Sequence, residues 1–235
     1  MEPQRAPEPV FGKINPVIVS LAFVIGGLEL LFLADEQGWI GGSGGIASRR
    51  YAIVDYAFWT QEFNAMFSDG KFNSTALVSF VTYPLIHFSF THAIISTVFV
   101  LAIGNLISRV FGAFGLLLIF FAPAAVGALA YGLTSNSSFP LAGATPAVYG
   151  FLGAFAAIIL DNIDRDRSSH SFKLLSIPVF LLALPTVSNI FLGDTEVWKA
   201  DIAGFATGFI ATGILKLGGV KSIVRLLRAI NRRNK

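Results

Sequence analysis

Long apolar stretches separated by short polar segments dominate the pattern of hydrophobic and polar positions along this chain of 235 residues. The apolar stretches cover residues 16–33, 91–107, 113–133, 146–159, 172–190 and 201–217. A helix needs about 20 predominantly apolar residues to cross a bilayer, and most of these stretches approach that length. The pattern therefore predicts an all-α integral membrane protein with six transmembrane helices.

Composition supports this prediction and excludes an ordinary soluble domain. Hydrophobic residues make up 54% of the chain and charged residues only 13%, and the mean hydropathy is +0.69. Such values are too apolar for a soluble protein and too evenly spread for a single membrane anchor. The chain has no cysteine, which excludes disulfides, thiolate metal sites and a cysteine nucleophile. We expect neither a cofactor nor a metal site.

The polar segments divide the chain into a tail at 1–13, one membrane domain at 14–217 and a basic tail at 218–235. The first apolar run is longer than the core of a signal peptide, about 7–15 residues, so we expect it to be retained. Residues 35–75 form a long connection between the first two spans, rich in aromatic and charged side chains. This composition is typical of segments that lie in the membrane interface.

The distribution of Lys and Arg predicts the orientation. Six spans place both termini on one side of the membrane, and that side then collects most of the basic residues. The other side keeps Arg49, Arg50, Lys71 and Lys199. Because cytoplasmic loops carry an excess of Lys and Arg, we expect both termini in the cytoplasm and the protein in a bacterial inner membrane.

The C-terminal tail reads KSIVRLLRAINRRNK, a basic amphipathic pattern. Such a segment beside a membrane span suits anionic lipid headgroups better than nucleic acid. We therefore expect lipid binding, and no nucleic acid partner. The side chains expected to contact lipid are Lys221, Arg225, Arg228, Arg232 and Arg233.

Three short motifs carry the candidate chemistry. TYPLIHFSFTH, at 82–92, leads into the second span and supplies His87 and His92. AGATPAVYGFLGA, at 142–154, opens the fourth span with the hydroxyl of Thr145, and ADIAGFATG, at 200–208, opens the sixth with the carboxyl of Asp201. A hydroxyl, an imidazole and a carboxyl are the groups from which nucleophilic sites are built.

In this order and with these separations, the motifs resemble the rhomboid family of intramembrane serine proteases, whose pattern is HxxxxHxxxN, then GxSGxxYG, then AHxxG. Thr145 stands at the position of the family's serine nucleophile, and Pro146 at the glycine that follows it. Asp201 stands at the general-base histidine, while His92 and Ser96 match the histidine and asparagine that bind the oxyanion. The resemblance implies a six-helix rhomboid-like bundle with a long interfacial first loop.

These replacements predict that the peptidase chemistry has been lost, so no catalytic residue is expected. Imidazole removes a hydroxyl proton well because its reference pKa of about 6.5 lies near working pH. An aspartate is a weak base, with a reference pKa of about 3.9, or a neutral acid where burial suppresses its charge. Threonine is branched at Cβ, which restricts χ1 and crowds the attack path. Ser96 and Pro146 also weaken the oxyanion site.

Thr145 and Asp201 are expected to form a structural pair instead, with the hydroxyl donating to the carboxyl group. Small residues allow two membrane helices to approach closely, and such an approach of the fourth and sixth spans would bring the two side chains within hydrogen-bond reach. The small residues expected at this contact are Gly150, Gly153, Gly204 and Gly208.

Glu29 is an acidic residue inside the first apolar run. A carboxylate at membrane depth is costly and usually faces protein or water. We expect Glu29 to reach the outer interface from the end of its helix; a partner across the bundle, such as a histidine of the second span, is the alternative. The Trp–Arg pair of the rhomboid first loop has no counterpart, since Val78 and Ser79 stand at its position, so that support is missing or built differently.

The resemblance and the replacements together predict a rhomboid-like pseudoprotease. It would bind transmembrane segments of client or partner membrane proteins without cleaving them, including the case of an accessory subunit in a larger membrane complex. Two alternatives stay open. One is an active intramembrane peptidase that uses Thr145. The other is proton or ion handling through Glu29, His92 and Asp201, since ionisable groups within membranes often mark ion paths.

Overall fold

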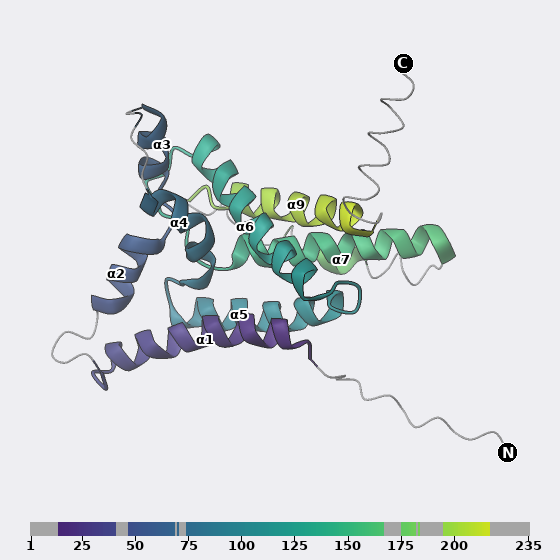
Figure 1. Cartoon of the computed structure of the whole chain (residues 1–235), viewed down its shortest axis with the longest axis horizontal. Coiled ribbons are helices and arrows are strands. Elements are labelled where there is room, and N and C mark those ends of the chain that lie inside the picture. Colours follow the sequence, from purple (N-terminus) through teal and green to yellow (C-terminus); the bar gives the residue numbers. More distant parts are fainter. Residues whose placement is uncertain are drawn as a thin grey trace.

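The computed structural model describes residues 14–40, 47–68, 70, 74–166, 175–181, 183 and 195–216. In these residues the fold is helical, as predicted, and its elements are drawn in Figure 1. They are α1 (Pro16–Glu36), α2 (Ala47–Tyr56), α3 (Thr60–Ser68), α4 (Ser74–Thr82), the 3₁₀ turn η1 (Tyr83–Leu85), α5 (Phe90–Ile107), α6 (Ala113–Thr134), α7 (Thr145–Asp166) and α9 (Trp198–Lys216).

Helices α1, α5 and α6 are each long and apolar enough to cross a membrane, and they coincide with the first three predicted spans. The apolar part of α7, Thr145–Asp161, is shorter. α9 covers the predicted sixth span but carries Asp201 in its first turn and Lys216 in its last. The predicted fifth span, 172–190, lies largely outside the described residues. An integral membrane protein is therefore supported, with three clear spans.

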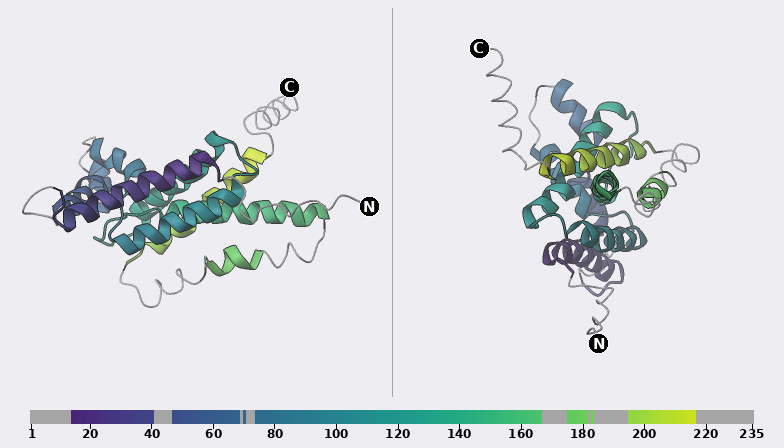
Figure 2. Two further views of the ribbon diagram at one scale, coloured as in Figure 1. Left: turned by 90° about the horizontal axis from the view of Figure 1, so that it is seen from below. Right: turned by 90° about the vertical axis from the view of Figure 1, so that its right-hand side faces the viewer.

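Helix α7 is the central element of the bundle. It contacts α5, α6 and α9, and the right-hand view of Figure 2 shows it end-on between α9 and the pair formed by α1 and α5. Its side chains Ala147, Phe151 and Ala154 are completely buried. A helix that is apolar on all sides lies in a protein core or crosses a membrane, so the sequence of α7 agrees with its central place.

The contact between α7 and α9 depends on glycine. A Cβ atom on Gly204 would collide with the carbonyl oxygen of Pro146, and one on Gly208 would collide with that of Gly150. A Cβ on Gly153 would in turn meet the backbone of α9. The two helices therefore touch backbone to backbone, an approach that only residues without a side chain permit.

The connection predicted at 35–75 consists mainly of short helices. α2, α3 and α4 gather at the end of the bundle where α1 ends and α7 begins (Figure 1). One side of this group packs inward, because Phe58 and Phe63 are buried and the Phe58 and Phe80 rings meet edge to face at 4.9 Å. Its other side exposes Tyr51 and Tyr56. The group thus has both an anchored and an exposed aromatic face.

Arg49 of α2 anchors this group to the bundle. Its guanidinium donates to both carboxylate oxygens of Glu29, at 2.7 and 3.0 Å, and to Glu36 at 2.6 Å. It also donates to the backbone carbonyl of His87 at 3.0 Å. The expectation that Glu29 reaches the outer interface is wrong: its side chain is buried, because α2 folds back over α1 and supplies a cation to it. The Trp–Arg pair that supports the first loop in rhomboids has no counterpart here, and Arg49 supports the loop instead.

Candidate functional site

The loop before α7 is fixed by backbone hydrogen bonds from two other segments. Leu141 forms an antiparallel bridge with Phe58, with N–H to carbonyl distances of 2.8 and 2.9 Å. The N–H of Gly143 donates to the carbonyl of Tyr83 at 2.9 Å. Gly143 has a φ of +109°, which residues with a side chain rarely adopt. Thr145 is therefore held at the start of its helix by a loop that is already shaped.

His87 supports the same loop with its ring. Its Nε2 atom accepts the N–H of Ala144 at 3.2 Å, so this nitrogen carries no proton. Burial, together with the neighbouring His92 and Arg49, lowers the pKa of His87 to about 3, although a hydrogen bond with the Leu85 backbone raises it. His87 is therefore a neutral structural acceptor.

This role predicts a pH dependence that replacement of His87 by glutamine removes. The unfolded chain takes up a proton on His87 near its ordinary pKa of about 6.5, while the folded protein does so only near pH 3. Stability is therefore lost as pH falls below 6.5, by about 2 kcal/mol at pH 5 relative to neutral pH. The measurement is the free energy of unfolding of wild type and His87→Gln in detergent at several pH values. If stability depended on pH in the same way in both proteins, His87 would not be a neutral acceptor.

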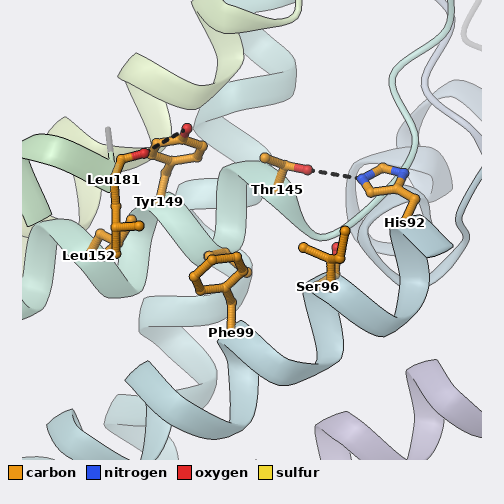
Figure 3. Close-up of a pocket in the computed structure, with 9 residues that line it drawn as sticks. His92, Ser96, Phe99, Thr145, Tyr149, Leu152 and Leu181 are labelled. Carbon is orange, nitrogen blue, oxygen red and sulfur yellow. Dashed lines mark hydrogen bonds between the residues drawn. The ribbon is translucent and has the colours of Figure 1, made fainter. Parts of the chain in front are cut away.

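Thr145 hydrogen-bonds His92, not Asp201. The distance from Thr145 Oγ1 to His92 Nε2 is 3.2 Å (Figure 3), so the predicted pairing of Thr145 with Asp201 is wrong. Ser89 caps α5 by accepting the N–H of His92 at 3.2 Å, which sets the imidazole in the first turn of that helix. The loop at Gly143 passes directly against the imidazole ring. The hydroxyl of Thr145 therefore bonds the imidazole of His92 instead of the carboxyl group of Asp201.

Asp201 is buried, with 3% of its surface exposed, and its Oδ1 atom has no hydrogen-bond partner among the described residues. Buried polar atoms are nearly always hydrogen-bonded, so each exception needs an explanation. The first turn of α9 nevertheless brings Asp201 to the wall of a small cavity that Thr145 and His92 also line. The sequence motifs therefore predicted the neighbourhood of these residues correctly but not their bonding.

A larger cavity, of about 340 Å³, opens beside Thr145 between α5 and α7. Ser96 faces it from α5 (Figure 3). On its far side the hydroxyl of Tyr149 donates to the carbonyl of Leu181 at 3.3 Å. Its lining residues are His92, Ile95, Ser96, Phe99, Thr145, Val148, Tyr149, Leu152 and Leu181. The walls are mainly apolar, with His92, Ser96 and Thr145 at one end of the cavity and the hydroxyl of Tyr149 at the other (Figure 3).

The arrangement contains half of a nucleophilic site. A hydroxyl within hydrogen-bond reach of an imidazole is the first requirement, and a third group that orients the imidazole is the second. The structure gives the His92 ring no further hydrogen bond within the described residues. Its neighbours are the ring of His87, edge to face at 5.0 Å, and the stacked ring of Phe88 at 6.5 Å. Nothing described here fixes His92 as a base.

Other predicted positions lie apart from this site. Glu29 is engaged by Arg49, and the described residues contain no group of three or more His, Asp or Glu side chains that could hold a metal ion. The predicted lipid-binding side chains Lys221, Arg225, Arg228, Arg232 and Arg233 lie outside the described residues. Arg49 was not identified from the sequence as a structural residue. The signal for it in the sequence is that it is a basic residue on the predicted non-cytoplasmic side, where few basic residues are expected.

Two comparisons with known proteins bear on this site. A search of curated proteins found no match. The family model of the rhomboid domain matches residues 74–217, more than half of the chain. The match begins at α4 and includes His92, Ser96, Thr145 and Asp201, the residues that the fold gathers around the two cavities. This chain therefore belongs to the rhomboid family of intramembrane serine proteases.

Proposed function

We propose that this protein is a rhomboid-like pseudoprotease that binds transmembrane segments of client or partner membrane proteins without cleaving them. One observation carries the proposal: at the position of the family's base stands a buried carboxyl group, and Thr145 hydrogen-bonds His92 in its place. A hydroxyl without an oriented base is a poor nucleophile. Loss of a nucleophile and base leaves only the residual rate that binding and oxyanion contacts supply.

The cavity between α5 and α7 supports the binding part of the proposal. Its volume of about 340 Å³ falls within the range of ligand pockets, about 300–1,000 Å³. Ile95 on its rim is 51% exposed, so the cavity is continuous with an apolar outer face of α5. Helices associate in membranes through packing and occasional polar contacts. A mainly apolar cavity with polar groups at its two ends suits side chains of a transmembrane segment.

The membrane arrangement is part of the same proposal. Helices α7 and α9 run in the same direction (Figure 1), as the fourth and sixth spans of a six-span bundle would. This supports a six-span bundle, which we propose has both termini in the cytoplasm and lies in a bacterial inner membrane. The basic C-terminal tail would then face anionic lipid. Such a protein could also serve as an accessory subunit of a larger membrane complex.

An active peptidase is the second candidate, and the contact of 3.2 Å between Thr145 and His92 favours it. In that case His92 would have to accept the hydroxyl proton. It could not then also donate a hydrogen bond to the oxyanion, so Ser96 would be the one side-chain donor left at the matching positions. Since the same imidazole would have to serve two opposed roles, binding without cleavage is the stronger proposal.

Proton or ion handling is weakened by the pairing of Glu29. Its carboxylate is held by both terminal nitrogens of Arg49, so it is neutralised in place. A proton path needs groups that can gain and lose protons in sequence. With Glu29 in a salt bridge, His92 and Asp201 do not extend into a chain of such groups among the described residues.

The test uses the full-length protein in liposomes with fluorescent transmembrane peptides. We expect peptide binding and no cleavage product, and we expect the double variant Thr145→Ser, Asp201→His to remain inactive because Ser96 and Pro146 are unchanged. Product that disappears in Thr145→Ala or in His92→Ala would establish the peptidase instead.

Ile95→Trp should weaken binding because it fills the cavity. Leu106→Trp, on the exposed face of the same helix but away from the cavity, is the matched control.

A further inference from the structure

A second cavity lies at the start of α7 and α9, with a volume of about 210 Å³. This volume is enough for several water molecules, each of which occupies about 30 Å³. Its lining residues are Phe88, His92, Phe139, Pro140, Leu141, Ala142, Thr145, Pro146, Thr195, Val197 and Asp201. We propose that this cavity binds the side chain of a lysine from a client segment, with Asp201 accepting a hydrogen bond from the ammonium group. The inference rests on the proposed function and names the residue that it recognises.

The unpartnered oxygen of Asp201 is the first argument. The residue is 97% buried by its exposed fraction of 3%, yet Oδ1 meets no donor in the described part of the chain. A buried acceptor without a partner costs about 1–3 kcal/mol, and more when it is charged. A ligand that brings a donor into the cavity removes this cost. The buried carboxyl group at the cavity wall therefore marks the place where a ligand with a donor is recognised.

The missing cation is the second argument. Lys199 lies closest to Asp201 in sequence, but its ammonium pairs with Glu196 at 2.9 Å and donates to the carbonyl of Thr134 at 2.8 Å. Arg49 is engaged with its own carboxylates. A buried carboxyl group in a membrane protein usually has a cationic or hydrogen-bonding partner. Neither of these two cations supplies one, and the ammonium group of a ligand would.

The lining of the cavity favours lysine over arginine. It includes the apolar side chains of Phe88, Phe139 and Val197 as well as the polar residues Thr145 and Asp201. Apolar side chains beside a carboxyl group fit the methylene stem and the ammonium of lysine. Arginine binds best in a bidentate way to two carboxylate oxygens. The compact ammonium of lysine needs only one carboxylate oxygen, so a carboxyl group at this wall suits it.

The walls of this cavity are already in place. Glu196 accepts the N–H of Asn136 at 3.0 Å, which ties the segment before α9 to the segment after α6. The bond from Lys199 to Thr134 does the same one turn later. A site that needs no rearrangement loses less free energy on binding. A lysine near the outer end of a client helix could extend into it, since long basic side chains reach along apolar surfaces toward polar groups.

The test compares synthetic transmembrane peptides that differ at one outer-end position, bearing lysine, methionine, glutamine or arginine, in zwitterionic vesicles that contain the full-length protein. We expect the lysine peptide to bind about tenfold more tightly than the methionine peptide, as for one hydrogen bond to a charged group. In Asp201→Asn this preference should fall to less than about twofold, while the methionine peptide binds as before. Thermal unfolding reports whether the variant is folded.

The outcomes separate the two proposals. Equal binding of all four peptides to the wild-type protein would overturn the lysine site and leave the proposed function standing. Binding of none would overturn both. A lysine preference that persists in Asp201→Asn would show that another group recognises the charge, and a preference for arginine would overturn the choice of lysine. If Asp201→Asn does not fold, the wild-type series alone decides, because glutamine and methionine peptides control for polarity and size.

Discussion

Replacing Arg49 with methionine lowers the free energy of unfolding by about 3–5 kcal/mol, the cost of stranding a buried charge whose partner has been removed. Glu29 is buried and would lose both of its hydrogen bonds to the guanidinium. Glu36 would lose its bond at 2.6 Å. Methionine has a similar length to the apolar stem of arginine, so the loss reports the charge and its hydrogen bonds. Unfolding by SDS in mixed micelles measures it.

Arg50 provides the matched control. It is the next residue in α2 and is exposed, so Arg50→Met should change stability by less than about 0.5 kcal/mol. The double variant Glu29→Gln, Arg49→Met should lose less than Arg49→Met alone, because a neutral amide is less costly to bury without a partner. Equal losses for Arg49→Met and Arg50→Met would mean that the pairing contributes nothing.

The same arginine links the outer helices to the candidate site. It donates to the carbonyl of His87, and the ring of His87 accepts the N–H of Ala144, the residue before Thr145. Two hydrogen bonds therefore join α2 to the start of α7. The structural arginine and the ligand-facing threonine belong to one network, so Arg49→Met should weaken peptide binding as well as stability.

The sequence predicted the first three spans well because long apolar runs have few alternatives in a membrane. It also predicted which groups meet, since the spacing of the three motifs places His92, Thr145 and Asp201 at the same end of their helices. The bond between Thr145 and His92 was not predictable in this way. Which of two neighbours takes a hydroxyl depends on distances of less than an ångström, and these are set by the loop at Gly143 and the cap at Ser89.

The pairing of Glu29 with Arg49 was hidden for another reason. The two residues lie 20 positions apart on different helices, and no periodic pattern relates them. Only the return of α2 over α1 brings them together. Side-chain pairs formed by irregular connections depend on the path of the loop, which apolar periodicity does not encode.

The glycines of α9 allow a comparison of one added methyl group at two positions. In Gly208→Ala the new Cβ would lie on the carbonyl oxygen of Gly150, so α7 and α9 must separate. Overpacking of this kind costs typically about 1–3 kcal/mol, and contact with backbone favours the upper end. In Gly213→Ala, later in the same helix, nothing lies within 4 Å of the new atom. There the higher helix propensity of alanine should stabilise by about 0.5–1 kcal/mol.

The two alanine variants should therefore change stability in opposite directions, as measured by SDS-induced unfolding. Separating α7 and α9 should also change the cavity at Asp201. Gly204, one helical turn after Asp201, packs against the backbone of Pro146, which lines that cavity. Gly208→Ala should then reduce the preference for the lysine peptide, while Gly213→Ala should retain it. Similar stability changes for both variants would show that the close approach of the helices is not needed. A lysine preference unchanged in Gly208→Ala would show that the cavity does not depend on this contact.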